Sequence, residues 1–245
     1  MGTAQTEARN DGGYLIQGKR VAMPCIVRDA SSGSAIFLVS AAAAQRLIPG
    51  DAFEVVEMAP GQAQLILGFV DYRDNDLGDY NEVMIIVFVK PKGTSIEAQG
   101  TFIYKLPVNQ SFTCEAGATI WGFPKTVEQI DIDYEDNRVT CKLVMDGQHL
   151  FTLTLPRVAD APETPDLEMT TYTYLDGPCA VPFSSGGTTA VVPGGDGVLL
   201  QLGSHPIAEE LRRLGLPATP MMSTWMEHMH GSFGEPRRIG GRGSI

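Results

Sequence analysis

The sequence predicts an α+β protein that is mainly antiparallel β with a few short helices, and three observations carry this prediction. Apolar runs of strand length recur along the chain, with turn residues such as Pro60-Gly61 and Asp136-Asn137 between them. Only three segments have a helical composition that begins with a serine or a proline. No repeat, heptad or linker divides the 245 residues, so we expect one domain over 20–235 and flexible tails over 1–19 and 236–245.

The first half of the chain is a series of expected strands. They cover 21–27, 35–39, 53–58, 62–72, 82–91 and 100–107. Ser31-Ser32-Gly33-Ser34 predicts a turn before the second of them. Residues 83–89 are apolar at every position, which indicates a central strand buried on both faces.

Helices are expected at 40–47, 111–120 and 206–214. Ser40 is the expected N-cap of the first, and Ser111 or Thr113 that of the second. Gly215 is expected to end the third helix. The methionine-rich segment 221–229 fits either a helix or a strand.

The second half of the chain predicts a hairpin, 130–135 with 138–145, followed by strands at 150–155, 168–175 and 198–202. Two glycine-rich segments, 186–187 and 194–197, do not lead into a helix. A phosphate cradle needs a helix N-terminus after the glycines, so we interpret both segments as turns.

Composition excludes several classes of function. The net charge is −11, and phosphate binding needs clustered Lys and Arg, so neither nucleic acid nor an anionic membrane is an expected partner. No run of apolar residues reaches membrane-spanning length and the N-terminus lacks a signal-peptide pattern, so we expect a cytoplasmic protein. The four scattered cysteines are expected to be buried, reduced thiols.

The sequence lacks the motifs of several common catalytic centres. Neither HExxH nor CxxC occurs, and GxSxG is absent. His228-Met229-His230 offers two metal ligands on one face only if it forms a strand. We therefore expect no catalytic metal, no cofactor and no serine nucleophile.

Lys125 stands out because it follows Ile120-Trp121-Gly122-Phe123-Pro124, a setting with two aromatic residues, an isoleucine and a proline. One interpretation is a surface lysine whose stem packs on the core. The other is an amine whose pKa is lowered by desolvation, which allows it to attack a ketone and form an imine.

The segment Trp121-Gly122-Phe123-Pro124-Lys125 resembles the catalytic-lysine signature of the acetoacetate decarboxylase family. Tyr80-Asn81-Glu82 is similar to that family's Tyr-x-Glu segment, and the stretch from Met23-Pro24 to Arg28 is similar to its N-terminal part. The resemblance runs from about residue 20 to residue 230 and implies the family's barrel or cone of β-strands. It also implies a tendency to form homo-oligomers.

The resemblance implies a role for each matching residue. Lys125 would form the imine, Glu82 would handle protons and Arg28 would bind the substrate carboxylate. Trp121, Phe123 and Tyr80 would line the substrate site. The implied activity is that of a carbon–carbon lyase acting on a small oxo acid.

Two departures from the family pattern leave the reaction open. Thr126 stands where decarboxylases carry a second lysine, and the apolar segment Leu65-Ile66-Leu67 stands where they carry a second carboxylate. Decarboxylation and aldol condensation with dehydration both remain possible reactions. A barrel that binds a small molecule without catalysis is the alternative, because these charged groups are missing.

Overall fold

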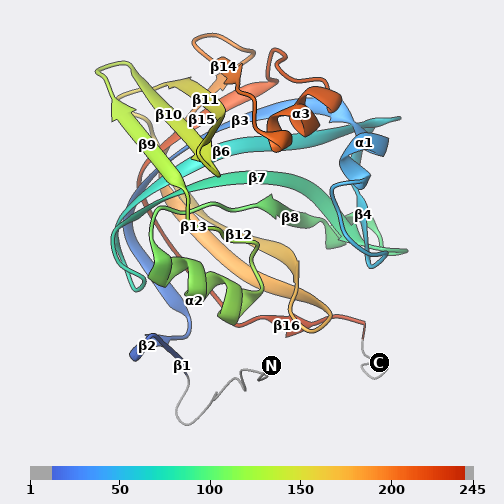
Figure 1. The fold of residues 1–245 in the computed structure, drawn as a ribbon, viewed down its shortest axis with the longest axis vertical. Coiled ribbons are helices and arrows are strands. Elements are labelled where there is room, and N and C mark those ends of the chain that lie inside the picture. The colour runs from blue at the N-terminus through green and yellow to red at the C-terminus, as the bar shows by residue number, and fades with distance from the viewer. Residues whose placement is uncertain (1–12, 241–245) are drawn as a thin grey trace.

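A ring of seven strands forms the centre of the protein in a computed structural model that describes residues 13–240 (Figure 1). The ring order is β7-β8-β12-β13-β15-β3-β6, and β6 pairs with β7 to close it. The bounds are β3 Cys25–Ser40, β6 Gln62–Asn75, β7 Tyr80–Pro91, β8 Gly100–Lys105, β12 Glu163–Tyr174, β13 Pro178–Pro193 and β15 Met222–Phe233. Closure removes the unpaired edges of an open sheet.

All neighbours in the ring are antiparallel except β8 and β12, which run parallel with Thr101 opposite Thr171. The expected fold class, mainly antiparallel β arranged as a barrel with a few short helices, is therefore confirmed. The segment 221–229, which fitted helix or strand, lies in β15.

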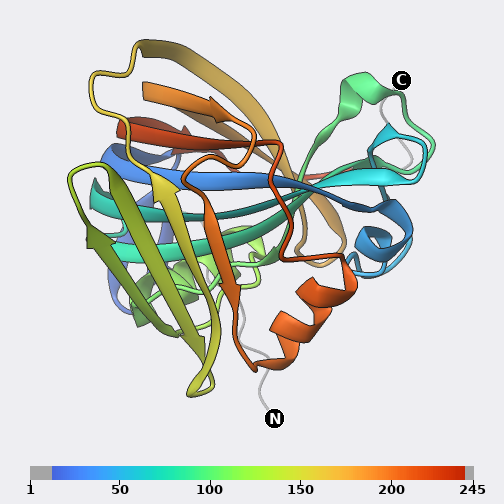
Figure 2. The ribbon, with the colours of Figure 1, turned by 90° about the horizontal axis from the view of Figure 1, so that it is seen from above.

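A four-stranded sheet covers one side of the barrel (Figure 2). Its strands are β9 Gln129–Tyr134, β10 Arg138–Met145, β11 Gln148–Pro156 and β14 Leu199–Leu202. The expected hairpin of β9 and β10 and the expected strand at β11 are confirmed. Residues such as Leu143, Phe151 and Leu153 pack from this sheet against Phe37 and Leu67 of the barrel, and this contact forms the larger core.

The barrel explains why β7 is apolar on both faces. Val83, Ile85, Val87 and Val89 are fully buried in the core between barrel and sheet. The alternate residues Met84, Ile86 and Phe88 line a cavity inside the barrel. The expected buried strand is confirmed, and its second apolar face belongs to the barrel lumen.

The described part of the chain also contains three α-helices and one 3₁₀ turn: α1 Ala41–Gln45, α2 Ser111–Trp121, α3 Pro206–Arg213 and η1 Ile96–Ala98. Ser40 caps α1 as expected, because its side chain accepts from the Ala43 amide. The expected cap of α2 is wrong. Gln110 caps this helix through its side-chain oxygen, which accepts from the Thr113 amide at 2.9 Å.

Two expected turns are wrong. Residues 31–34 lie inside β3, a strand of 16 residues, where their small side chains allow close packing. A Cβ added at Gly33 would lie 2.9 Å from Phe69 and 3.2 Å from Trp225. Gly186-Gly187 likewise lies inside β13, at a β-bulge opposite β15. Residues 194–197 do form the expected turn.

The N-terminal region contains more structure than expected. Residues 1–12 and 241–245 lie outside the described residues. Within the expected tail of 1–19, β1 Gly13–Ile16 forms a strand that pairs with β2 Lys19–Ala22, which begins at the last residue of that tail. Ile16 and Val21 are buried in a second apolar cluster, which accounts for the order there. Three short strands pair with individual strands of the ring: β4 Phe53–Val55 with β7, β5 Glu57–Ala59 with β6, and β16 Arg237–Arg238 with β13.

Two further expectations can be compared with residues 13–240. No helix in this range has the length and apolar character needed to cross a membrane. All four cysteines are free; Cys25, Cys141 and Cys179 are buried as expected, whereas Cys114 is partly exposed.

Candidate functional site

The barrel lumen contains a cavity of about 240 Å³. Lys125, Glu82, Tyr80, Trp121 and Phe123 all line it. Five of the six residues that the sequence suggested for the site therefore lie together, although they come from β7, from α2 and from the loop after α2.

The loop that carries Lys125 is shaped by the residues before it. Gly122 ends α2 in the left-handed conformation with φ +70°, and the Phe123 amide bonds back to the Gly117 carbonyl at 3.1 Å. A Cβ on Gly122 would lie 2.3 Å from the Tyr174 carbonyl oxygen, so a glycine is required there. The Lys125 amide then donates to the Phe123 carbonyl at 2.8 Å, a tight turn around Pro124. Lys125 is thereby directed back across the helix.

Gly117 provides the surface on which the Lys125 side chain rests. A Cβ at this position would lie 2.5 Å from Lys125 Cδ and 2.6 Å from its Cε. Sequence reasoning did not select Gly117, although a glycine within a predicted helix is unfavourable and signals close packing.

The amine of Lys125 is held by three groups. Its Nζ lies 2.7 Å from Glu82 Oε2, and the two side chains are only 4% and 8% exposed. Nζ also donates to Thr113 Oγ1 at 3.3 Å. The Tyr80 ring lies beneath it, with 5.0 Å between Nζ and the ring centroid. The interpretation of Lys125 as a surface lysine is wrong, because its amine is buried.

Tyr72 is a second residue that sequence reasoning missed. Its hydroxyl donates a long, 3.4 Å hydrogen bond to Glu82 Oε1, and its ring stacks on Tyr80 at 4.6 Å. Burial, together with the charge of Glu82, raises the pKa of both Tyr72 and Tyr80 well above the usual range. Both phenols therefore keep their protons, and that of Tyr72 is donated to Glu82. The alternation of side chains along the expected strand 62–72 was the sequence feature that could have placed Tyr72 on the same face as the other lumen residues of that strand.

Two aromatic residues close the site beside the lysine. Trp121 and Phe123 stack with 5.7 Å between ring centroids, and Phe233 packs against both. The Trp121 indole donates to the Gly234 carbonyl at 2.9 Å, which fixes the ring. Cys25 also lines the cavity, and burial raises the pKa of its thiol to about 12, so it is a poor nucleophile.

Arg28 is the one suggested residue that the structure does not bring to the cavity. The alternation of β3 turns Cys25 and Val27 into the lumen and Arg28 away from it. The guanidinium is 45% exposed and pairs with Asp74 at 2.8 Å and Asp76 at 2.7 Å. The expected contact between Arg28 and a substrate carboxylate is therefore not supported by this geometry.

The two positions that depart from the family pattern also differ in location. Thr126 is exposed and does not line the cavity, whereas Ile66 does.

No cluster of three or more metal-binding side chains occurs among residues 13–240. Lys125 and Glu82 are the charged residues of the lining within that range.

Comparison with known proteins gives one family match. The family described as acetoacetate decarboxylase matches residues 18–229. No curated protein matches the chain in sequence.

Solved structures resemble this one across most of both chains. Acetoacetate decarboxylase from Legionella pneumophila superposes with a TM-score of 0.62 at 16% identity, covering 89% of this chain and 87% of that one. The enduracididine biosynthesis enzyme MppR, complexed with the condensation product of pyruvate and imidazole 4-carboxaldehyde, has a TM-score of 0.58 at 15% identity and coverages of 94% and 97%. An acetoacetate decarboxylase-like enzyme from Sphingomonas wittichii has a TM-score of 0.53 at 16% identity, covering 95% of this chain and 100% of that one.

Proposed function

Because the chain belongs to the acetoacetate decarboxylase family, we propose that it is a carbon–carbon lyase in which Lys125 forms an imine with the carbonyl group of an oxo acid. One observation carries this proposal: a lysine and a carboxylate lie 2.7 Å apart in an apolar cavity, both almost fully buried. A lysine inside a barrel lumen without a chemical role would be costly to bury.

The ion pair supplies the proton transfers of imine formation. Lys125 passes a proton to Glu82 and attacks the carbonyl carbon as a neutral amine. Glu82 then returns the proton to the carbinolamine oxygen, which leaves as water. The product is an imine, and its protonated form withdraws electrons from the neighbouring carbon.

Two reactions can follow from the same imine. In the first, the bond to the carboxylate breaks, carbon dioxide leaves and the electron pair forms an enamine. In the second, a proton leaves instead, the enamine attacks an aldehyde, and loss of water follows. The complex of MppR with a condensation product of pyruvate favours including the second reaction. In the first reaction the enamine is protonated on carbon to give an imine again, and in both reactions hydrolysis of the imine regenerates Lys125.

The surrounding residues have supporting roles in this proposal. Tyr72 donates to Glu82 and orients its carboxylate, while Thr113 positions the amine. Trp121 and Phe123 exclude water from the imine, which water would otherwise hydrolyse.

Borohydride trapping tests the proposal. The protein is incubated with acetoacetate or pyruvate, reduced, digested and analysed by mass spectrometry. We expect a reduced adduct on Lys125 that disappears in Lys125→Met and persists in Lys92→Met, a control at an exposed lysine. The proposal fails if no oxo acid labels Lys125, or if both variants lose labelling equally.

A non-catalytic binding barrel is the second candidate. The cavity lining favours it: among residues 13–240, Lys125 is the one cationic side chain of the lining, so the carboxylate of an oxo acid has no second cation to bind. Adduct formation without release of carbon dioxide or of a condensation product, over a panel of oxo acids and aldehydes, would support this candidate.

A further inference from the structure

The cavity extends far beyond the reactive lysine. On β7, Glu82, Met84, Ile86 and Phe88 alternate along the lumen, and all four line the cavity. These positions span six residues, which corresponds to ~20 Å at ~3.3 Å per residue. On the neighbouring strand β6, Tyr72, Val70 and Ile66 line a parallel wall. The lumen is therefore much longer than acetoacetate.

The two ends of this lumen differ in polarity. Lys125, Glu82, Tyr72, Tyr80 and Asn75 gather at one end. Towards the other end the walls carry Met84, Ile86, Phe88 and Ile66, and no charged side chain. A ligand that fits both ends carries its reactive polar group at one end and an apolar chain at the other.

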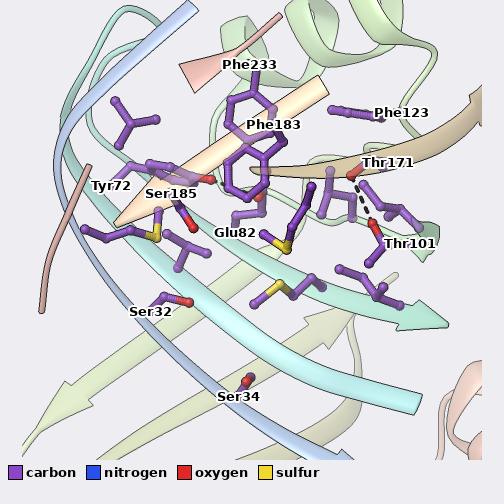
Figure 3. A pocket seen from close by; sticks show the side chains of 18 of the residues that line it. Ser32, Ser34, Tyr72, Glu82, Thr101, Phe123, Thr171, Phe183, Ser185 and Phe233 are labelled. Carbon is purple, nitrogen blue, oxygen red and sulfur yellow. Dashed lines mark hydrogen bonds between the residues drawn. The ribbon is translucent and has the colours of Figure 1, made fainter. Parts of the chain in front are cut away.

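Short side chains keep the middle of the lumen open. Small barrels ordinarily fill their interior with side chains, but Ser32, Ser34 and Ser185 line this one (Figure 3). On β6, a Cβ at Gly68 would lie 2.6 Å from Met84 Cε, so the methionine rests directly on the glycine. Met84 is a flexible wall that adapts to an inserted chain.

Five hydroxyl groups of the lumen already have partners, so they do not require a polar ligand. Ser34 Oγ and Thr224 Oγ1 are 2.7 Å apart, and Thr101 Oγ1 and Thr171 Oγ1 are 3.0 Å apart. Figure 3 shows the Thr101–Thr171 bond. Ser32 donates to the Phe69 carbonyl at 3.3 Å. Apart from Ser185, the remaining lining between Met84 and Phe88 consists of aliphatic, thioether and aromatic groups.

We propose that the lumen between Glu82 and Phe88 is a tail-binding channel, and that the substrate is an oxo acid whose carbonyl carries an extended alkyl chain. This inference rests on the proposed function only for the reaction at Lys125, and binding of the alkyl chain does not depend on it. A β-oxo acid of this kind would place its carbonyl carbon at Lys125. The bond to the carboxylate breaks, carbon dioxide leaves and the electron pair forms an enamine. Protonation of the enamine carbon restores the imine, and its hydrolysis releases a methyl ketone with the same alkyl chain.

A chain-length series tests the channel. Unbranched β-oxo acids from acetoacetate to β-oxodecanoate are trapped with borohydride on the full-length protein, and the concentration that half-saturates labelling of Lys125 is measured. We expect it to fall about three- to fourfold for each added methylene until the channel is filled. A half-saturating concentration that is independent of chain length would overturn the channel and leave imine formation intact.

A variant that blocks the channel, compared with a matched surface variant, tests the route of the alkyl chain. Ile86 lies four residues from Glu82, ~13 Å along the strand, and faces the lumen. In Ile86→Trp, the ratio of half-saturating concentrations between acetoacetate and β-oxodecanoate should approach one. In Val191→Trp, at a position 54% exposed on β13, it should keep the wild-type value. A wild-type ratio in both variants would contradict the assigned route of the tail.

Binding of unreactive ligands separates this inference from the proposed function. Secondary alcohols of rising chain length cannot form an imine, and calorimetry measures their affinity directly. An affinity that rises with the length of the alkyl chain supports the channel, whether or not an oxo acid labels Lys125. Absence of labelling on Lys125 refutes only the proposed lyase. An affinity that does not rise refutes the channel.

Discussion

Lys125 Nζ and Glu82 Oε2 lie 2.7 Å apart inside the barrel, although 43 positions separate the two residues in the chain. Each side chain is the buried counter-ion of the other.

Removal of both partners should destabilise the protein by less than the sum of the two single losses. Lys125→Met or Glu82→Gln leaves the other group buried without its partner, which costs about 3–5 kcal/mol in typical buried pairs. The double variant removes both groups, so its free energy of unfolding should recover by more than 1 kcal/mol relative to the sum of the single losses. Urea unfolding of the four proteins measures this coupling, and strictly additive losses would contradict it.

Gly117→Ala should separate stability from reactivity. Alanine favours the helix by about 1 kcal/mol, but its Cβ would occupy the place of Lys125 Cδ. We expect the rate of borohydride trapping to fall at least about tenfold with little loss in the free energy of unfolding. The control Ala118→Gly, on the exposed side of α2, should lose stability and keep its trapping rate. An unchanged rate in Gly117→Ala would show that the lysine does not depend on this surface.

Gly122→Ala should lower the free energy of unfolding more than Gly61→Ala does. Both glycines have positive φ, +70° and +76°, so both variants carry the left-handed strain of about 1–2 kcal/mol. Gly61 has open space around it, whereas a Cβ at Gly122 meets the Tyr174 carbonyl at 2.3 Å. The difference in free energy of unfolding between the two variants isolates this contact. Equal losses would show that the loop relaxes at no cost.

Alkaline pH should destabilise the fold through Tyr72 and Tyr80. Burial raises the pKa of both phenols in the folded protein, while unfolded phenols titrate near pH ~10. Below that pH both states are protonated and stability does not depend on these groups. Above it the unfolded state loses protons first, so the free energy of unfolding falls by about 1.4 kcal/mol per pH unit for each phenol. Tyr72→Phe should reduce this slope, and an unchanged slope would contradict the assignment.

Arg28 should be dispensable for substrate saturation. Its guanidinium pairs with Asp74 and Asp76 outside the lumen. We expect Arg28→Gln to leave the half-saturating concentration of an oxo acid unchanged in the trapping assay. Lys19→Gln, at an exposed position of β2, is the control for a lost surface charge. A large rise of the half-saturating concentration in Arg28→Gln, but not in Lys19→Gln, would show that Arg28 contributes to substrate binding.

The local sequence was sufficient to predict most strands and all three α-helices. Strand alternation, turn residues and capping residues act over a few positions, so Ser40, Pro60-Gly61 and the β9–β10 hairpin could be recognised without tertiary contacts. The residues 31–34 and 186–187 could not, because small residues have the same composition in a turn and in a closely packed strand. Phe69 and Trp225, distant in sequence, decide that Gly33 belongs to a strand.

The sequence by itself determined the family, the barrel and the unusual apolar setting of Lys125, because these depend on local patterns and on a contiguous motif. Only the tertiary structure decided which residues meet. Closure of the ring brings Glu82 and Tyr72 to the lysine, and the alternation of β3 turns Arg28 away from it. A side chain enters the lumen or leaves it according to strand register, and register is fixed by pairing between distant segments.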